Sequence, residues 1–179
     1  MPTKTIITLF FPLFVFSCNH NQQKNIKDKV DLTEESAKST EEKLHDRFIN
    51  KKLESINEIL SDRNTIDDKK ILLIYTGFDC QSCVDKGYLI LKSIKSQDDN
   101  QKIFIISTNA NIGGDQERNE FYDFVFNDKQ ELIRTELKFI YTPVIIVLDK
   151  ENRIVYLDFP KTNTKEQDII KQIEKVISK

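Results

Sequence analysis

Two of the three cysteines in this chain stand three positions apart, in Cys80-Gln81-Ser82-Cys83. An apolar run precedes the motif and a helical pattern follows it, so we expect Cys80 at or near a helix N-terminus and Cys83 on the same face, within reach of it. Backbone N–H groups and the positive end of the helix dipole favour a thiolate there. The spacing therefore predicts a dithiol that exchanges disulfides, with Cys80 attacking and Cys83 resolving the mixed disulfide.

The elements that must position this dithiol alternate between helices and strands. Apolar runs rich in β-branched residues predict strands at 71–75, 103–107, 121–126, 144–148 and 154–157. Apolar residues at helical spacing predict helices at 41–61, 84–96 and 129–138, and a last helix that Thr164 and Gln167 cap and that runs to 177. Asn152 tolerates a left-handed turn, so the last two strands are expected to form a hairpin. This order predicts an α/β fold with a central mixed β-sheet flanked by α-helices on both sides.

With these elements in place, residues 68–179 resemble the thioredoxin superfamily, more closely the membrane-tethered, thioredoxin-like thiol-disulfide oxidoreductases of the TlpA or redoxin type in the bacterial envelope. The resemblance rests on the strand-CxxC-helix unit, on Tyr141-Thr142-Pro143-Val144 leading into a strand, and on the hairpin with its terminal helix. It implies a thioredoxin-like fold in which a cis Pro143 faces the dithiol and Thr142 offers backbone groups to an extended substrate. The implied partners are protein thiols or disulfides, and no cofactor is required. The sequence leaves the direction of electron flow open, and the family analogy favours a reductase fed by a membrane electron donor.

The motif departs from the family pattern at three positions that could tune its redox properties. Asp79 replaces the Trp that often precedes the first cysteine, and Gln81 and Ser82 replace the usual dipeptide between the cysteines. A carboxylate about 6 Å from a thiolate costs roughly 0.7 to 3 kcal/mol, and the helix end contributes about 0.3 to 2 kcal/mol. The direction in which the Cys80 pKa shifts is therefore left open. If Asp79 is instead the N-cap, its side chain turns toward N–H groups and not toward the sulfur.

Other interpretations of Cys80 and Cys83 stay open. A purely structural disulfide closes so small a loop that it would contribute about 2 kcal/mol, and it would make the domain a non-catalytic binding module. A zinc site needs four ligands, whereas the two histidines, His20 and His45, stand in other segments, and no metal is expected. A peroxidase would want Thr-x-x-Cys, and Thr76 stands one residue too far from Cys80.

The N-terminal segment is interpreted as a targeting segment. Residues 1–17 have the shape of a lipoprotein signal peptide, in which Val15-Phe16-Ser17-Cys18 resembles a lipobox with Cys18 as the lipidated residue. As a helix, its apolar run, Ile6 to Phe16, would cover roughly 16 Å of a 30 Å hydrocarbon core, which is too short to span a membrane. An uncleaved core element and ordinary secretion are the alternatives.

Residues 18–40 are polar enough to predict a flexible tether, which leaves 41–179 as the thioredoxin-like domain. We therefore expect a lipid-anchored protein of the cell envelope that faces the periplasm. The chain has 27 Lys and Arg residues against 29 Asp and Glu residues, a net charge of −2. This balance disfavours binding to nucleic acid.

Overall fold

The computed structural model describes residues 39–60, 68–108, 124–138 and 140–179, which belong to the unit Glu34–Lys179. The strands are β1 (Lys70–Thr76), β2 (Lys102–Thr108), β3 (Phe124–Asn127), β4 (Val144–Leu148) and β5 (Ile154–Asp158). The helices are α1 (Thr40–Phe48), α2 (Ser55–Ile59), α3 (Gln81–Gln97), α4 (Leu132–Glu136) and α5 (Glu166–Ile177). None of these described helices is long and apolar enough to span a bilayer.

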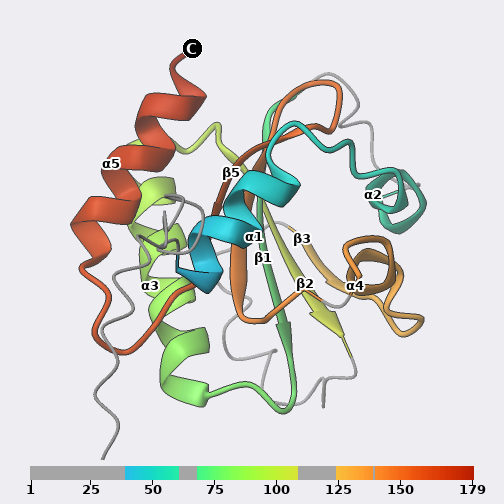
Figure 1. Cartoon of the computed structure of the whole chain (residues 1–179). Coiled ribbons are helices and arrows are strands. Elements are labelled where there is room, and N and C mark those ends of the chain that lie inside the picture. Colours follow the sequence, from blue (N-terminus) through green and yellow to red (C-terminus); the bar gives the residue numbers. More distant parts are fainter. Residues whose placement is uncertain (1–38, 61–67, 109–123, 139) are drawn as a thin grey trace, which may run out of the picture. The chain divides into compact units, whose positions relative to one another are not determined.

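The strands form one mixed sheet in the order β3-β2-β1-β4-β5, with helices on both of its faces (Figure 1). Strand β1 pairs in parallel with β2 and antiparallel with β4, so that Ile71 lies opposite Ile103 on one side and Val147 on the other. Every residue of β1 is buried, as expected for a central strand that is covered on both faces. The predicted mixed sheet flanked by helices is confirmed.

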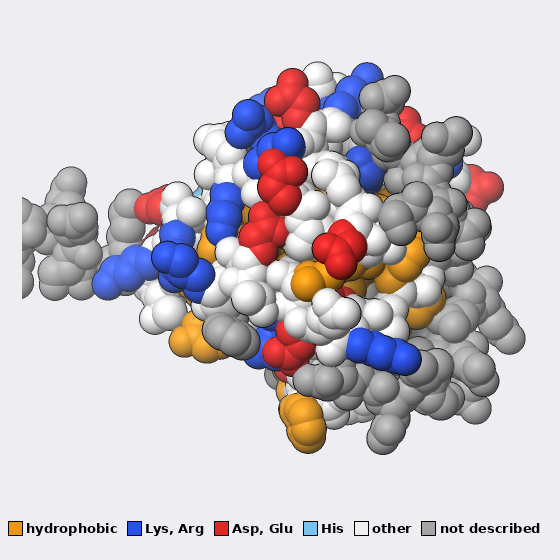
Figure 2. Space-filling view, turned by 90° about the vertical axis from the view of Figure 1, so that its right-hand side faces the viewer, with side chains coloured by type: hydrophobic (Ala, Val, Ile, Leu, Met, Phe, Trp, Pro, Cys, Tyr) orange, Lys and Arg blue, Asp and Glu red, His pale blue; other side chains and the backbone are white. Residues whose placement is uncertain are grey.

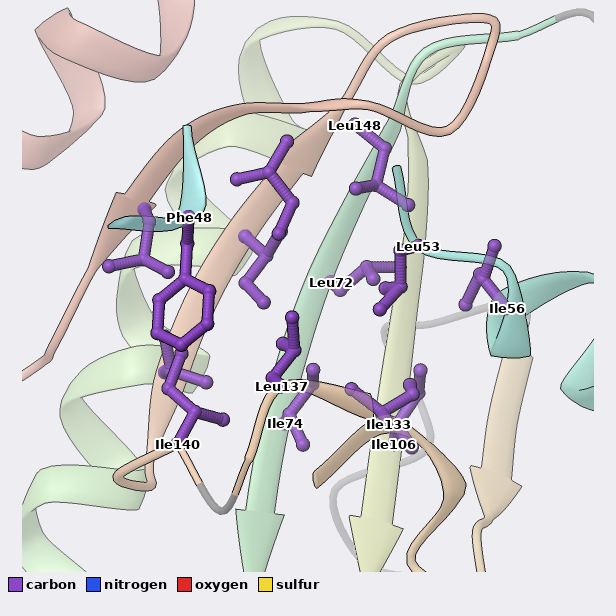
Figure 3. Packing of buried hydrophobic residues seen from close by; sticks show 14 of the residues in the cluster. Phe48, Leu53, Ile56, Leu72, Ile74, Ile106, Ile133, Leu137, Ile140 and Leu148 are labelled. Atoms are coloured by element: carbon purple, nitrogen blue, oxygen red, sulfur yellow. The ribbon is translucent and has the colours of Figure 1, made fainter. Parts of the chain in front are cut away.

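Each face of the sheet has its own cluster of buried side chains. Leu72 of β1 packs on the face covered by α1, α2 and α4, in one cluster with Phe48 and Ile133 (Figure 3). Its neighbour Leu73 belongs to the opposite cluster, with Ile90 of α3 and residues of α5. This alternation follows from the two-residue period of side chains along a strand. Helix α3, whose start includes the dithiol, is therefore held on one defined face of the sheet.

Helix α3 packs closely against β1 because Gly87 has no side chain. A Cβ atom at Gly87 would lie 2.8 Å from Cδ1 of Leu73, which is fully buried. A larger residue at this position would force the Leu73 side chain to shift. The same helix is joined to α5 by an ion pair in which Nζ of Lys86 lies 2.8 Å from Oε1 of Glu166.

The prediction of one helix over 41–61 is wrong, because the backbone leaves the helix after Phe48 and begins α2 only at Ser55. Asn50 has a left-handed backbone with φ 66°. Its N–H donates to the carbonyl of Ile154 at 2.8 Å, and the N–H of Leu53 donates to the carbonyl of Asn152 at 2.9 Å. Pairing with the hairpin therefore replaces helical hydrogen bonds. Because the side chains of Phe48 and Leu53 are still buried, the apolar spacing resembled that of one continuous helix.

Two helix boundaries also differ from their predictions. The N-cap of α5 is Lys165 without a side-chain cap, and Oγ1 of Thr164 accepts from the N–H of Lys161, so the capping box predicted at Thr164 and Gln167 is wrong. Helix α4 is shorter than the predicted 129–138, because the carboxylate of Asp128 accepts from the first N–H groups of the helix, those of residues 132 and 133.

The remaining elements agree with the sequence or lie outside the described residues. Strands β1, β2, β4 and β5 match their predicted runs within about a residue, and Asn152 in the hairpin has φ 62° as anticipated. Strand β3 lies at the end of the predicted run 121–126. The predicted signal peptide and most of the predicted tether, which include Cys18, lie outside the described residues.

Candidate dithiol site

The turn between β1 and α3 fixes the start of the CxxC motif. The N–H of Asp79 donates to the carbonyl of Thr76 at 3.2 Å, and the N–H of Phe78 donates to Oγ1 of Thr76 at 3.2 Å. Cys80 is then the N-cap of α3, and its carbonyl accepts from the N–H of Cys83 at 2.9 Å. The predicted position of Cys80 at the helix N-terminus is confirmed. The helix itself begins three residues earlier than the predicted 84–96.

The two thiols differ in exposure and in acidity. Both cysteines are free, Cys80 exposed and Cys83 partly buried. Hydrogen bonds from the Cys83 side chain, from the Ser82 side chain and from the Cys83 backbone lower the pKa of the Cys80 thiol below its ordinary value. The side-chain contact with Cys80, together with burial, raises the pKa of the Cys83 thiol. Cys80 is therefore the more acidic thiol of the pair and the one that more readily forms the attacking thiolate.

The Ser82 hydroxyl lies 3.1 Å from Sγ of Cys80. Once Cys80 is a thiolate, only the hydroxyl can donate in this contact, so Ser82→Ala should raise the pKa of Cys80. We expect the pH profile of Cys80 alkylation by iodoacetamide, followed by mass spectrometry, to move to higher pH. Ser82→Thr keeps the hydroxyl and is the matched control. An unchanged midpoint in Ser82→Ala would show that the contact contributes nothing to thiolate stability.

The Thr142-Pro143 segment lies beside the residue that precedes the dithiol. The Thr142-Pro143 peptide bond is cis, as the family resemblance implied. Oγ1 of Thr142 donates to Oδ1 of Asp79 at 2.8 Å. The fold therefore brings Thr142 next to Asp79 across 63 positions of sequence, as the proposed substrate-binding role of Thr142 and Pro143 requires.

The Asp79 carboxylate binds the end of β1 and Thr142, and not the start of α3. It is not the N-cap of α3, because Cys80 occupies that position. Its second carboxylate oxygen, Oδ2, accepts from the N–H of Thr76 at 2.7 Å. The groups that set the pKa of Cys80 are Cys83 and Ser82, whereas the Asp79 charge makes a smaller contribution to the raised pKa of Cys83. No feature of the local sequence indicated the contact between Asp79 and Thr142.

Gln81, the other residue between the cysteines, has its amide engaged elsewhere. Nε2 of Gln81 donates to Oδ1 of Asp85 at 2.9 Å, one turn along α3. Of the predicted tuning residues, Ser82 is thus the one in direct contact with the Cys80 sulfur. Within the part of the chain that the structure describes, no three His, Cys, Asp or Glu side chains gather as metal ligands would.

The fold resembles that of several solved structures. The thioredoxin domain of a thiol-disulfide oxidoreductase from Bacteroides vulgatus is similar with a TM-score of 0.52 and 17% sequence identity, over 66% of this chain and 84% of that one. A secreted disulfide oxidoreductase of Mycobacterium tuberculosis gives a TM-score of 0.49 and 15% identity, over 61% and 82%. An exposed lipoprotein thioredoxin of Streptococcus pneumoniae gives 0.46 and 16%, over 65% and 89%. No family model and no curated protein sequence matches the chain.

The Bacteroides vulgatus structure establishes the fold of this chain. The chain has a thioredoxin-like fold, with a five-stranded mixed sheet flanked by helices. Its CxxC pair lies where a central strand turns into a helix, which is consistent with a redox site. Sequence identity at this level shows a shared architecture only.

Proposed function

We propose that this protein is a thiol-disulfide oxidoreductase that exchanges disulfides with protein thiols through Cys80 and Cys83. The observation behind the proposal is the division of properties within the pair. Cys80 is exposed and its pKa is lowered, whereas Cys83 is partly buried and its pKa is raised. An accessible, more acidic thiol beside a shielded, less acidic one is the arrangement needed for an attacking and a resolving cysteine. The proposed chemistry requires no cofactor.

The proposed cycle has two exchange steps. The Cys80 thiolate attacks one sulfur of a substrate disulfide and forms a mixed disulfide, and the other substrate sulfur leaves as a thiolate that takes up a proton. Cys83 then loses its proton to water, attacks the Cys80 sulfur and releases the second substrate thiolate. Two electrons pass to the substrate, and Cys80 and Cys83 end as a disulfide. The reverse sequence oxidises a substrate dithiol.

We assign the reducing direction, with a membrane electron donor that restores the dithiol after each cycle. This assignment is supported by the resemblance of residues 68–179 to membrane-tethered thioredoxin-like proteins. The donor must itself supply two electrons and two protons for each disulfide that it reduces.

Trapping of mixed disulfides tests the proposed function. In Cys83→Ser the first step remains and the second is blocked, so substrate proteins should stay linked to Cys80 on non-reducing gels. The double variant Cys80→Ser/Cys83→Ser should trap nothing. A wild-type pair that stays oxidised and inert toward thiols would favour the alternative, a non-catalytic binding module with a structural disulfide.

Exposed aromatic side chains beside the site support a protein as the partner. Among the described residues the exposed large hydrophobic side chains are Phe78, Tyr141 and Leu89, with exposed fractions of 91%, 63% and 49%. Phe78 precedes Asp79, and Tyr141 precedes Thr142, so the hydrogen bond between Asp79 and Thr142 joins the two segments that contain them. Side chains of this kind gain from burial against apolar groups of a protein chain.

Removing both aromatic side chains should selectively weaken the binding of protein substrates. Because burying one large apolar side chain is worth about 1.5 to 3 kcal/mol, we expect Phe78→Ser/Tyr141→Ser to raise KM for a protein disulfide about tenfold or more. The rate with a small disulfide such as the disulfide of thionitrobenzoate with itself should change much less. Leu89→Ser, which removes an exposed apolar side chain from a later turn of α3, is the matched control. Equal losses on both substrates would exclude the aromatic contact.

The charge pattern agrees with a protein partner. On the face drawn in Figure 2, basic and acidic side chains are interspersed, and the net charge of the chain is −2. Binding to nucleic acid depends on a cationic surface that neutralises phosphates. We therefore do not propose nucleic acid as a partner.

We also propose that the protein is held at the membrane of the cell envelope, facing the periplasm, by lipid on Cys18. The support is the lipobox-like Val15-Phe16-Ser17-Cys18. Cys18→Ser should move the chain from the membrane fraction to the soluble fraction and abolish incorporation of labelled palmitate. A Cys18→Ser variant that keeps its label would contradict lipidation at this residue.

A further inference from the structure

We infer that Asp79 is a positioning residue whose carboxylate holds the Thr142-Pro143 segment at the end of β1, beside the dithiol. The inference deepens the proposed function and rests on it, because a held segment matters for exchange only if that segment receives the substrate. It assigns to Asp79 a role other than tuning the Cys80 thiol.

Both oxygens of the Asp79 carboxylate are engaged by donors from different elements. Oδ2 accepts from the N–H of Thr76, the last residue of β1, at 2.7 Å. Oδ1 accepts from Oγ1 of Thr142, just before β4, at 2.8 Å. Both distances are typical of hydrogen bonds to a charged acceptor, which are stronger than neutral ones. Asp79 is only partly exposed, so water competes less for these donors than at an open surface.

The carboxylate bridges the strand ends where backbone pairing stops. Strands β1 and β4 pair from Lys70 opposite Leu148 to Ile74 opposite Val144. The same register, continued, would place Thr76 opposite Thr142. Pro143 has no N–H to donate, so the backbone ladder cannot continue unbroken past Val144. Asp79 connects these two residues through its side chain.

These two hydrogen bonds determine which groups of the Thr142-Pro143 segment can bind a substrate. The Thr142 hydroxyl donates to Asp79, so the backbone groups of Thr142 are the ones left for an extended substrate chain. Neither donor that engages Asp79 belongs to the dithiol, and the hydrogen bonds that lower the pKa of the Cys80 thiol come from Cys83 and Ser82. The hydrogen bonds of the Asp79 carboxylate thus join the end of β1 to the segment before β4.

Four single variants separate the hydrogen bond from the charge. Asp79→Ala and Thr142→Val each remove the bond. Thr142→Ser keeps a hydroxyl, and Asp79→Asn keeps an acceptor for Thr76 and an amide that can donate to the Thr142 hydroxyl. The readout is the single-turnover rate at which the reduced, full-length chain, kept in detergent, reduces a disulfide. Two substrates are compared. One is a mixed disulfide of thionitrobenzoate with a cysteine-containing peptide, and the other is the small disulfide that thionitrobenzoate forms with itself.

We expect the ratio of the peptide rate to the small-disulfide rate, at low substrate concentration, to fall about tenfold in Asp79→Ala and in Thr142→Val, the change expected when one such hydrogen bond is lost. Thr142→Ser and Asp79→Asn should each recover most of the ratio. The double variant Asp79→Ala/Thr142→Val should lose no more than Asp79→Ala alone, because the bond that Thr142→Val removes is already absent there.

Three outcomes would overturn the inference. The first is a wild-type ratio in Thr142→Val, and the second is a double variant whose losses multiply. The third is Asp79→Asn behaving as Asp79→Ala, which would mean that the charge and not the bond matters. If the wild-type chain reduces neither disulfide, the proposed function fails, and hydrogen exchange of the Thr76 amide then decides on the contact. The Thr76 amide should exchange faster in Asp79→Ala than in wild type. Unchanged protection would exclude the hydrogen bond between Asp79 and Thr76.

Discussion

Replacing Cys80 by serine should abolish turnover of a protein disulfide by the full-length chain, a loss on the order of 10³-fold or more, as for removal of other enzymatic nucleophiles. The reason is chemical, since the attacking species in disulfide exchange is a thiolate and a serine hydroxyl stays protonated at neutral pH. The measurement is the initial rate of substrate reduction with excess dithiothreitol as electron donor, corrected for the reaction of dithiothreitol alone.

Cys83→Ser is the matched control, because it removes the other sulfur of the same motif. Assayed without dithiothreitol, which could itself resolve the mixed disulfide, it should still release one equivalent of substrate thiol in the first attack by Cys80. Roles assigned to the wrong cysteines would produce the opposite result, a stoichiometric burst in Cys80→Ser and none in Cys83→Ser.

Truncating Phe48 to alanine should lower the free energy of unfolding by about 3 to 5 kcal/mol. Phe48 has an exposed fraction of 1%, and its ring lies among the side chains that pack on the face of the sheet under α1 (Figure 3). A loss of this size is a large part of the 5 to 15 kcal/mol that typically stabilises a domain. Urea denaturation followed by far-ultraviolet circular dichroism measures it.

Lys43 supplies the comparison within the same helix, because its side chain is exposed. Lys43→Ala should change the free energy of unfolding by less than about 0.5 kcal/mol. If Phe48→Ala costs no more than Lys43→Ala, then α1 is not part of the folded core and the packing of Figure 3 is wrong.

The parts of the fold that could be predicted are those whose signals are local. The continuous apolar run at 71–75 predicts a buried strand because neither face of β1 meets water. Asn152 indicates its turn because few other residues tolerate a left-handed backbone. Cys80 could be placed at a helix start because the change from a strand pattern to a helical one occurs at the motif itself.

The parts that could not be predicted depend on contacts between distant segments. The break after Phe48 follows from backbone bonds to the hairpin, and the spacing of Phe48 and Leu53 fits a helix equally well. The contact of Asp79 with Thr142 joins residues 63 positions apart, so local spacing could not indicate it. The predicted cap at Thr164 failed for a different, local reason, because a turn with Lys161 uses the same hydroxyl.

The proposed redox cycle is tested most directly by equilibrating the full-length chain in glutathione buffers that span about −270 to −120 mV, the range of related dithiols. The fraction with Cys80 and Cys83 joined is read from the mass of the peptide that contains both. We expect one reversible two-electron transition within this range that is absent from Cys80→Ser, and a midpoint in its lower half for the reducing direction. A pair that remains fully reduced or fully oxidised at every potential would contradict disulfide exchange at this site.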